Sequence, residues 1–219
     1  MNKYNIITDL QELEKFISFL PELLEGERLY VSLLSRKKYF SEISSNNQQL
    51  KRFLTTKDLL ISKIKQLEIE VGGYTFDGKP IPQEALALYI SVNPRSLWRG
   101  SCEGLKRLAD VVARGDKNVD PQKLIMNCVQ SSAGQKNFVV FDIDEKNQDL
   151  LKKSLDIVGE QCYIETRGGY HLLVDPKTIG QEVKNWYGQL KQFSDVSGIE
   201  MSPIPGATQG GFSVKLKRL

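Results

Sequence analysis

Histidine and cysteine are scarce in this sequence. The 219 residues include one histidine, His171, and three cysteines, Cys102, Cys128 and Cys162. A single histidine excludes a site that needs several histidines from one chain, such as a three-histidine zinc centre. The cysteines are odd in number and widely spaced, so they indicate neither a zinc knuckle nor a disulfide framework. Reduced thiols of an intracellular protein are the simplest interpretation.

Long apolar runs and a strong excess of one charge are also absent. No uninterrupted apolar segment approaches the ~20 residues that cross a bilayer, and the N-terminus has no apolar signal region. We therefore expect a soluble, cytoplasmic protein with no membrane partner. The 30 lysines and arginines against 27 aspartates and glutamates leave a formal charge of +3. This excludes a histone-like protein bound by bulk charge, so any contact with nucleic acid must use a local patch.

Periodicity in the sequence predicts an α+β fold with one mostly antiparallel sheet in the C-terminal half. The length suits one large or two small domains, and we expect one continuous domain with an N-terminal part (1–135) and a C-terminal part (136–219). The expected helices span 8–25 (capped by Thr8 and divided at Pro21), 47–67, 101–114, 121–130, 147–158 and 176–193. The expected strands span 28–34, 87–92, 138–141, 162–166, 170–174, 198–202 and 211–217, with a Gly/Pro-rich loop over 72–83.

Asp142 and Asp144 are the first candidates for chemistry, because they follow the apolar run 138–141. In a strand, residues i and i+2 point to the same face, with Cα atoms roughly 6.6 Å apart. Two neighbouring carboxylates repel each other and cost desolvation energy, which a cation relieves, and hard oxygen ligands favour Mg²⁺ or Mn²⁺. The alternative is that the strand has ended, both acids are solvated, and Asp144 helps to cap the next helix.

The second candidate is the segment 165–171 (ETRGGYH). Its two glycines, Gly168 and Gly169, allow a tight turn whose amides can meet phosphate oxygens. Arg167 and His171 flank this turn, so both can contact the same anion. The alternative is an ordinary hairpin with an exposed arginine and a satisfied histidine. That alternative is weakened because the one histidine of the chain lies on the strand after the turn.

A third group of candidates lies toward the C-terminus. A strand bearing Glu200 runs into a Pro/Gly turn, which makes Glu200 a candidate third carboxylate, with Asp195 as its competitor. Asp175 is a weaker candidate because capping a helix is sufficient to explain it. The chain then continues to three basic residues, which either neutralise phosphate charge or form a solvated tail: Lys215, Lys217 and Arg218.

In this order, the three features resemble the motifs of the archaeo-eukaryotic primase superfamily, which includes the catalytic subunits of primases and the primase-polymerases of viruses and plasmids. The first motif of that superfamily consists of three hydrophobic residues followed by Asp, one hydrophobic residue and a second Asp. Residues 139–144 (VVFDID) match it. The second, small-x-His, is matched by 169–171 (GYH), and the third, a hydrophobic residue followed by an acid, by 199–200 (IE). The turn 205–208 (PGAT) resembles the Pro-Gly-Ser/Thr turn near the third motif of several members. The resemblance covers roughly residues 136–215, and no zinc-binding stem is present.

The resemblance implies a primase-type, RRM-like catalytic core flanked by N-terminal helices. The implied activity is template-directed nucleotidyl transfer to a 3′-hydroxyl, as a primase, a polymerase or both. The implied partners are a single-stranded DNA template, nucleoside triphosphates, and a helicase or other replication protein in trans. A viral source would place the protein in the host cytoplasm. Two other functions stay open: a metal-dependent nuclease that uses the same acids, and a catalytically degenerate accessory protein that binds nucleic acid.

The resemblance also assigns roles to residues. Two divalent ions, Mg²⁺ or Mn²⁺, are held by Asp142, Asp144 and Glu200, with Asp195 as the alternative third ligand. The nucleotide is bound by Arg167, Gly168, Gly169, His171 and Lys215. The candidates for the template strand are basic residues of the N-terminal part, with Trp98 as a stacking surface: Arg36, Lys37, Lys38, Arg95 and Arg99.

Overall fold

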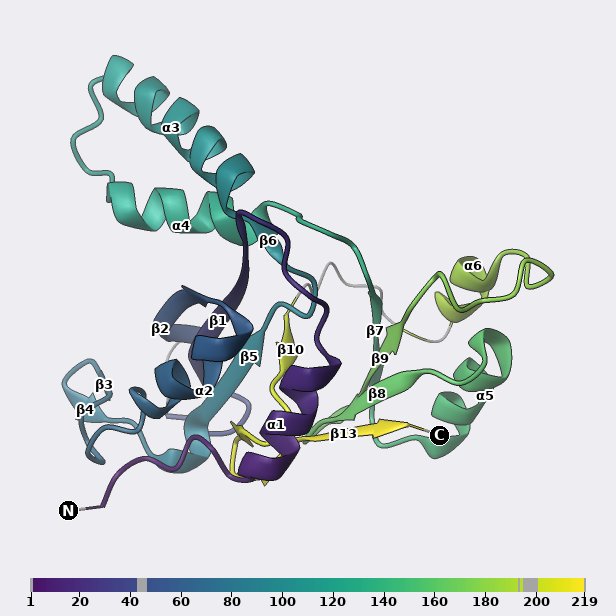
Figure 1. Ribbon diagram of the computed structural model, residues 1–219. Coiled ribbons are helices and arrows are strands. Elements are labelled where there is room, and N and C mark those ends of the chain that lie inside the picture. The colour runs from purple at the N-terminus through teal and green to yellow at the C-terminus, as the bar shows by residue number, and fades with distance from the viewer. Residues whose placement is uncertain (1, 43–46, 193, 195–200, 219) are drawn as a thin grey trace.

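Two antiparallel sheets with helices packed on them form the body of the protein (Figure 1). The computed structural model describes residues 2–42, 47–192, 194 and 201–218. Within these residues there are six α-helices, one short 3-10 helix, η1 (Gln83–Ala85), and a small hairpin of β3 (Thr75–Phe76) and β4 (Lys79–Pro80). The α+β class predicted from the sequence is confirmed.

The first sheet is built around β1 (Glu27–Arg36) and runs in the order β12-β11-β5-β1-β2. Its other strands are β2 (Asn47–Thr55), β5 (Leu86–Ile90), β11 (Thr208–Gln209) and β12 (Phe212–Ser213), with β6 (Arg95–Ser96) paired to β1 and β10 (Ser202–Pro203) paired to β5. Because side chains alternate along a strand, β1 has two different faces. One buries Leu29, Val31 and Leu33 in the core. The other directs Ser32 and Arg36 toward a cleft.

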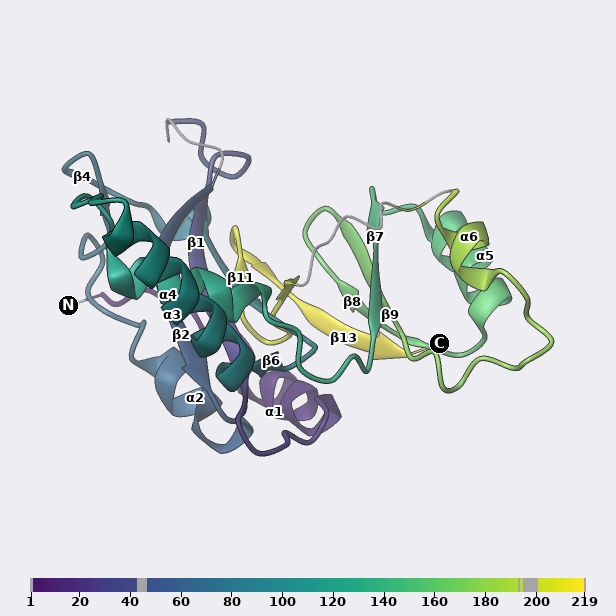
Figure 2. The same cartoon turned by 90° about the horizontal axis from the view of Figure 1, so that it is seen from above.

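The second sheet has the order β13-β8-β9-β7, with β7 (Val139–Asp144), β8 (Cys162–Glu165), β9 (Gly169–Val174) and β13 (Lys215–Arg218). Helices α5 (Gln148–Val158) and α6 (Trp186–Leu190) cover the face that points away from the first sheet (Figure 2). Phe141 and Ile143 of β7 pack under these helices. The opposite face of β7 therefore carries Val140, Asp142 and Asp144 toward the first sheet.

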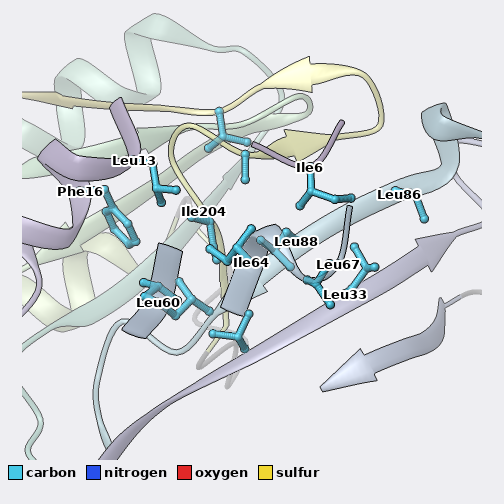
Figure 3. Close-up of a cluster of buried hydrophobic side chains, with 14 of the residues drawn as sticks. Ile6, Leu13, Phe16, Leu33, Leu60, Ile64, Leu67, Leu86, Leu88 and Ile204 are labelled. Atoms are coloured by element: carbon cyan, nitrogen blue, oxygen red, sulfur yellow. The ribbon is translucent and has the colours of Figure 1, made fainter. Parts of the chain in front are cut away.

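One hydrophobic core joins the two sheets. It contains side chains of α1 (Leu10–Phe19), α2 (Lys57–Lys65), β1 and β5, several of which are labelled in Figure 3. Val140, Ile164, Leu173 and Leu216 add one residue from each strand of the second sheet. The C-terminal segment ties the sheets together, because β10, β11 and β12 belong to the first sheet and β13 to the second. A division near residue 135 therefore does not coincide with sheet membership.

A helical hairpin of α3 (Leu97–Ala113) and α4 (Pro121–Ser131) extends from the body beside the first sheet, with α4 next to β2 (Figure 1). Its two helices pack closely because α3 presents glycines to α4. A Cβ atom on Gly100 would lie 2.5 Å from Cα of Val129, and one on Gly104 would lie 3.0 Å from a side-chain carbon of Ile125.

Four expected elements differ in the structure. The first helix begins at Leu10 with Asp9, not Thr8, as its cap, and it ends at Phe19 before Pro21 can break it. The expected helix over 47–67 is wrong in its first half. Residues 47–55 form β2 because they pair with β1 along its length, and this tertiary pairing outweighs local propensity.

The expected helix over 176–193 shortens to the five residues of α6. The Asp175 side chain instead accepts a hydrogen bond from the Lys177 backbone N–H at 2.9 Å, which closes a turn. The expected loop over 72–83 contains the β3–β4 hairpin. Residues 198–200 of the expected strand 198–202 lie outside the described residues.

Candidate functional site

The pairing of β7 with β9 brings together the aspartate pair and the histidine. Asp142 lies opposite His171 in the register, and Asp144 lies opposite Gly169. His171 shares its face of β9 with Leu173, which belongs to the core between the sheets. The two carboxylates and the imidazole therefore lie next to the core between the sheets, where they line a cleft.

His171 is buried and uncharged. Its Nε2 atom lies 3.5 Å from Oδ1 of Asp142, and its Nδ1 atom lies 3.2 Å from Oγ of Ser202. Burial, reinforced by the positive charges of Lys38 and Arg36, lowers the pKa of His171 to about 4. At neutral pH the ring therefore carries one N–H, and since a carboxylate only accepts, we assign this proton to Nε2, facing Asp142, with the Ser202 hydroxyl donating to Nδ1.

The opposite wall of the cleft is basic and comes from the end of β1 and the turn after it. Arg36 and Lys38 line the cleft together with Asp142 and Asp144. Burial and the neighbouring Arg36 lower the pKa of Lys38, whereas the charges of Asp144 and Asp142 raise it, so lysine and aspartates interact across the cleft. The charge of Arg167 also acts on Lys38, so a third cation lies near this wall, although Arg167 does not line the cleft.

Aromatic rings and hydrogen bonds hold the two arginines in place. Arg36 donates to Oδ1 of Asn47 at 2.9 Å and to the hydroxyl of Tyr89. Arg167 lies over the ring of Tyr39, with its guanidinium carbon 4.7 Å from the centroid, and donates to the Gly210 carbonyl at 2.5 Å. The guanidinium groups are thus positioned before any anion arrives.

The cleft has a volume of about 400 Å³, within the range of small-molecule sites. Six of its lining residues are among those predicted from the sequence: Arg36, Lys38, Asp142, Asp144, Gly168 and His171. Nine uncharged residues that were not predicted complete the walls: Ser32, Leu34, Asn47, Gln49, Tyr89, Gln130, Thr166, Met201 and Gln209. These come from seven different segments of the chain, and no local motif marks them.

The two glycines of the turn have different roles. Gly168 lines the cleft, and the nearest atom to a Cβ built on it is Nζ of Lys38, at 3.8 Å. A Cβ on Gly169 would lie 2.0 Å from the Ile143 carbonyl oxygen of β7. Gly169 is therefore required by strand packing, and Gly168 leaves space beside the basic wall.

Four predicted site residues lie elsewhere. Arg95 is only 1% exposed, so the prediction that it binds a template is wrong. Arg99 is exposed on α3, and Lys37 is exposed beside the cleft without lining it. Lys215 is exposed on β13 opposite Glu165 and does not line the cleft either. Glu200 and its competitor Asp195 lie outside the described residues.

A larger cavity of about 800 Å³ lies on the other side of the second sheet, between α5 and the β8–β9 hairpin. The Glu165 carboxylate at this cavity is already paired, because Lys217 bonds it at 2.6 Å and Lys146 lies 3.6 Å from it. This pairing accounts for Lys217 as a structural residue. The smaller cleft differs from this cavity, because aspartates and cations there face each other across open space.

Asp142 and Asp144 have the donor chemistry of a divalent-ion site. Among residues 2–42, 47–192, 194 and 201–218, no group of three or more His, Cys, Asp and Glu side chains is close enough to hold a metal. Two carboxylates suit Mg²⁺ nonetheless, because this ion keeps water and substrate phosphates as its other ligands. The donor pair therefore fits Mg²⁺ or Mn²⁺ together with a bound phosphate.

Comparison of the chain with protein-family models, curated proteins and solved structures found no match. None of the helices in the described part of the chain combines the length and hydropathy that a membrane span requires.

Proposed function

We propose that this protein is a template-directed nucleotidyltransferase, a primase or primase-polymerase that joins nucleoside triphosphates to a 3′-hydroxyl. The observation that carries the proposal is the cleft itself, which has a volume of about 400 Å³. Asp142 and Asp144 of the second sheet line one side of it, and Arg36 at the end of β1 and Lys38 on the turn after β1 line the other. A nucleoside triphosphate with its divalent cation matches a cleft that has acids on one side and cations on the other. The divalent cation needs carboxylate ligands, and the phosphates need basic groups.

The order of the motifs supports the same proposal and suggests a primase-type catalytic core. The β7-α5-β8-β9 unit carries the first two motifs, and the register Asp142–His171 brings them into contact. Under this proposal the unit forms the RRM-like part of the core, with β13 added beside β8 rather than beside β7.

Each residue of the cleft has a separate task under this proposal. Asp142 and Asp144 hold Mg²⁺ or Mn²⁺, which when bound neutralises charge on the reacting phosphate and the departing pyrophosphate. Lys38, Arg36 and Arg167 bind the triphosphate oxygens and orient the α-phosphate toward the attacking hydroxyl. His171, which is neutral, positions the Asp142 carboxylate through its Nε2–H and presents no extra charge to repel the metal.

A basic groove that adjoins the cleft offers a path for the nucleic-acid strand. It lies between β2 and α4, has a volume of about 770 Å³, and shares Asn47 and Gln49 with the cleft. One acid, Asp120, lines this groove. Four cations line it as well: Lys51, Arg52, Lys63 and Lys123. We place the template in this groove, because the backbone of a single strand needs a row of cations that leads to the reaction centre.

The experiment is incubation of the purified protein with single-stranded template, all nucleotides and Mg²⁺ or Mn²⁺, with and without a primer. We expect the product strand to lengthen, and we expect Asp142→Ala to reduce this activity at least ~100-fold while the protein stays folded. Asp156→Ala, an exposed acid on α5, is the matched control and should retain activity.

Two results would contradict the proposal. Shortening of a labelled strand by the same acids would identify a nuclease. Binding of single strands with a steep salt dependence, but no response to Mg²⁺ or triphosphates, would identify a degenerate accessory protein.

A further inference from the structure

The cavity beside α5 lies on the outer face of the second sheet, and the proposed function does not use it (Figure 2). Its volume of about 800 Å³ is within the range of small-molecule sites. Leu151 and Leu155 line it from α5, and Tyr163 of β8 and Tyr170 of β9 line it from the sheet. The cavity therefore has aliphatic carbon on its helix side and aromatic rings on its sheet side.

Two phenol hydroxyls on the sheet side have no hydrogen-bond partner among the described residues. Tyr163 and Tyr170 are only 7% and 5% exposed, and their rings meet edge to face with centroids 5.7 Å apart. Tyrosine hydroxyls that are buried to this degree usually have a partner. Neither oxygen is sealed inside the protein, so both open into the cavity that the two residues line. Only water or a ligand can supply their hydrogen bonds there.

The polar groups of the cavity lie close together, because three neighbouring strands carry them on the same face. Tyr170 lies opposite Glu165 in the register, and Tyr163 lies opposite Lys217. The hydrogen bond to Glu165 raises the pKa of Lys217 most, and charge interactions with both tyrosines add to this effect, so the phenol oxygens lie near the ion pair. A ligand therefore meets a carboxylate that accepts, an ammonium that donates, and two hydroxyls that can do either.

The charges around the cavity balance, unlike those of the basic groove between β2 and α4. Four acids and two lysines line the cavity: Asp149, Asp156, Glu160, Glu165, Lys152 and Lys217. Two further cations lie on these acids, because Lys146 is 3.6 Å from Glu165 and Arg218 is 3.6 Å from Glu160. Four positive charges thus match four negative ones, and they are interspersed rather than divided between two sides. The cavity therefore favours neither a phosphate nor a cationic ligand.

We propose that this cavity is a second ligand site, which takes an uncharged aromatic molecule with a group that both donates and accepts hydrogen bonds, such as a carboxamide. The ring packs between the leucines of α5 and the two tyrosine rings, where edge and face contacts are favourable. The polar group meets the phenol hydroxyls and the Glu165–Lys217 pair. It is required because a purely apolar ligand would displace water from these groups without replacing its hydrogen bonds. The proposal does not depend on the function assigned to the cleft.

The first test compares three probes that share an indole ring and differ in charge: uncharged indole-3-acetamide, anionic indole-3-acetate and cationic tryptamine. Each is titrated into the ¹⁵N-labelled full chain and followed by amide NMR shifts. We expect indole-3-acetamide to bind with a Kd of about 1 mM, typical of a ligand of this size, and to shift signals of α5, β8 and β9. Both charged probes should bind at least ~5-fold more weakly, because their charge loses hydration without gaining a net opposite charge.

Three results of this titration would overturn the proposal. Equal affinity for all three probes would identify unspecific apolar binding. Tighter binding of either charged probe would contradict the balance of charges. The absence of shifts in α5, β8 and β9 at roughly ten times the expected Kd would show that the cavity takes no ligand of this class.

The second test removes the hydroxyls and keeps the rings. Tyr163→Phe and Tyr170→Phe should each weaken binding of indole-3-acetamide about 5-fold, the effect of one lost hydrogen bond. Tyr187→Phe is the matched control and should bind like the wild type, because Tyr187 is 41% exposed on α6 and does not line the cavity. Leu155→Trp, at a half-buried position of the helix side, should fill part of the cavity and abolish binding. Unchanged affinity in both cavity tyrosine variants, or an equal loss in Tyr187→Phe, would refute the proposed site.

Discussion

Adjacent glycines in the β8–β9 turn allow a direct test of how the site is held together. We predict that Gly169→Ala destabilises the protein strongly, whereas Gly168→Ala stabilises it slightly. A methyl group on Gly169 would lie 2.0 Å from the Ile143 carbonyl oxygen and 3.1 Å from the Glu145 backbone nitrogen. On Gly168 the closest atom would be the flexible end of Lys38, at 3.8 Å, which is an ordinary contact.

The size of each stability change depends on which atoms must move to accommodate the new methyl group. Neither glycine has a positive φ, so backbone strain does not distinguish them. Replacing glycine by alanine at a compatible position stabilises a protein by about 0.4–1 kcal/mol through the unfolded state, which sets the expectation for Gly168→Ala. At Gly169 the clash is with backbone of β7, so either the strand end or the turn must shift. Overpacking of this kind costs about 3 kcal/mol, which corresponds to a fall in Tm of roughly 6–12 °C for a chain of this size.

Urea and thermal unfolding followed by circular dichroism measure both variants under the same conditions. The reasoning fails if Gly169→Ala unfolds within about 0.5 kcal/mol of the wild type, or if the two variants lose the same stability. Because Gly169 lies opposite Asp144 in the register, the proposed function predicts that Gly169→Ala also lowers nucleotide incorporation. The cleft geometry of Gly168→Ala should stay intact.

Two further predictions concern contacts outside the cleft. Gly206→Ala should cost about 3 kcal/mol in chemical denaturation, since Gly206 has φ +78° and a Cβ there would lie 2.3 Å from the Asp9 carbonyl oxygen. Gly211→Ala, with φ +79° and no neighbour within 4 Å, should cost only the ~1 kcal/mol of strain, and equal losses would contradict the clash. Lys217→Met should cost less than about 1 kcal/mol at pH 7, because Lys217 is half exposed. The hydrogen bond from Lys217 holds the pKa of Glu165 below the usual 4.5. The stability that this pair contributes is therefore present above pH 4.5 and is lost as the pH falls through the lower pKa of the folded state. A difference in unfolding free energy between Lys217→Met and the wild type that persists in acid would refute this ion pair as its source.

The C-terminal half shows how local patterns predict structure. The apolar run before Asp142, the hairpin around Gly168 and the helix over 147–158 all appeared where the sequence indicated them. Each is specified by neighbours in the chain, through alternation, turn chemistry or a 3.6-residue period. The strand β2 was mistaken for a helix because its partner, β1, decides its conformation and the segment 47–55 alone does not.

By itself, the sequence determined the α+β class, most elements, and the acids, glycines and single histidine that are candidates for chemistry. Only the tertiary structure decided which of them meet. The β7–β9 register placed Asp142 beside His171, and the face of β1 opposite the core brought Arg36 toward the aspartates. The tertiary structure also buried Arg95 in the interior and left three large apolar residues of α3 exposed, namely Trp98, Leu105 and Val112. The physical reason is that a residue's type states what chemistry it can perform, whereas its burial and neighbours are set by the pairing of strands that lie far apart in the chain.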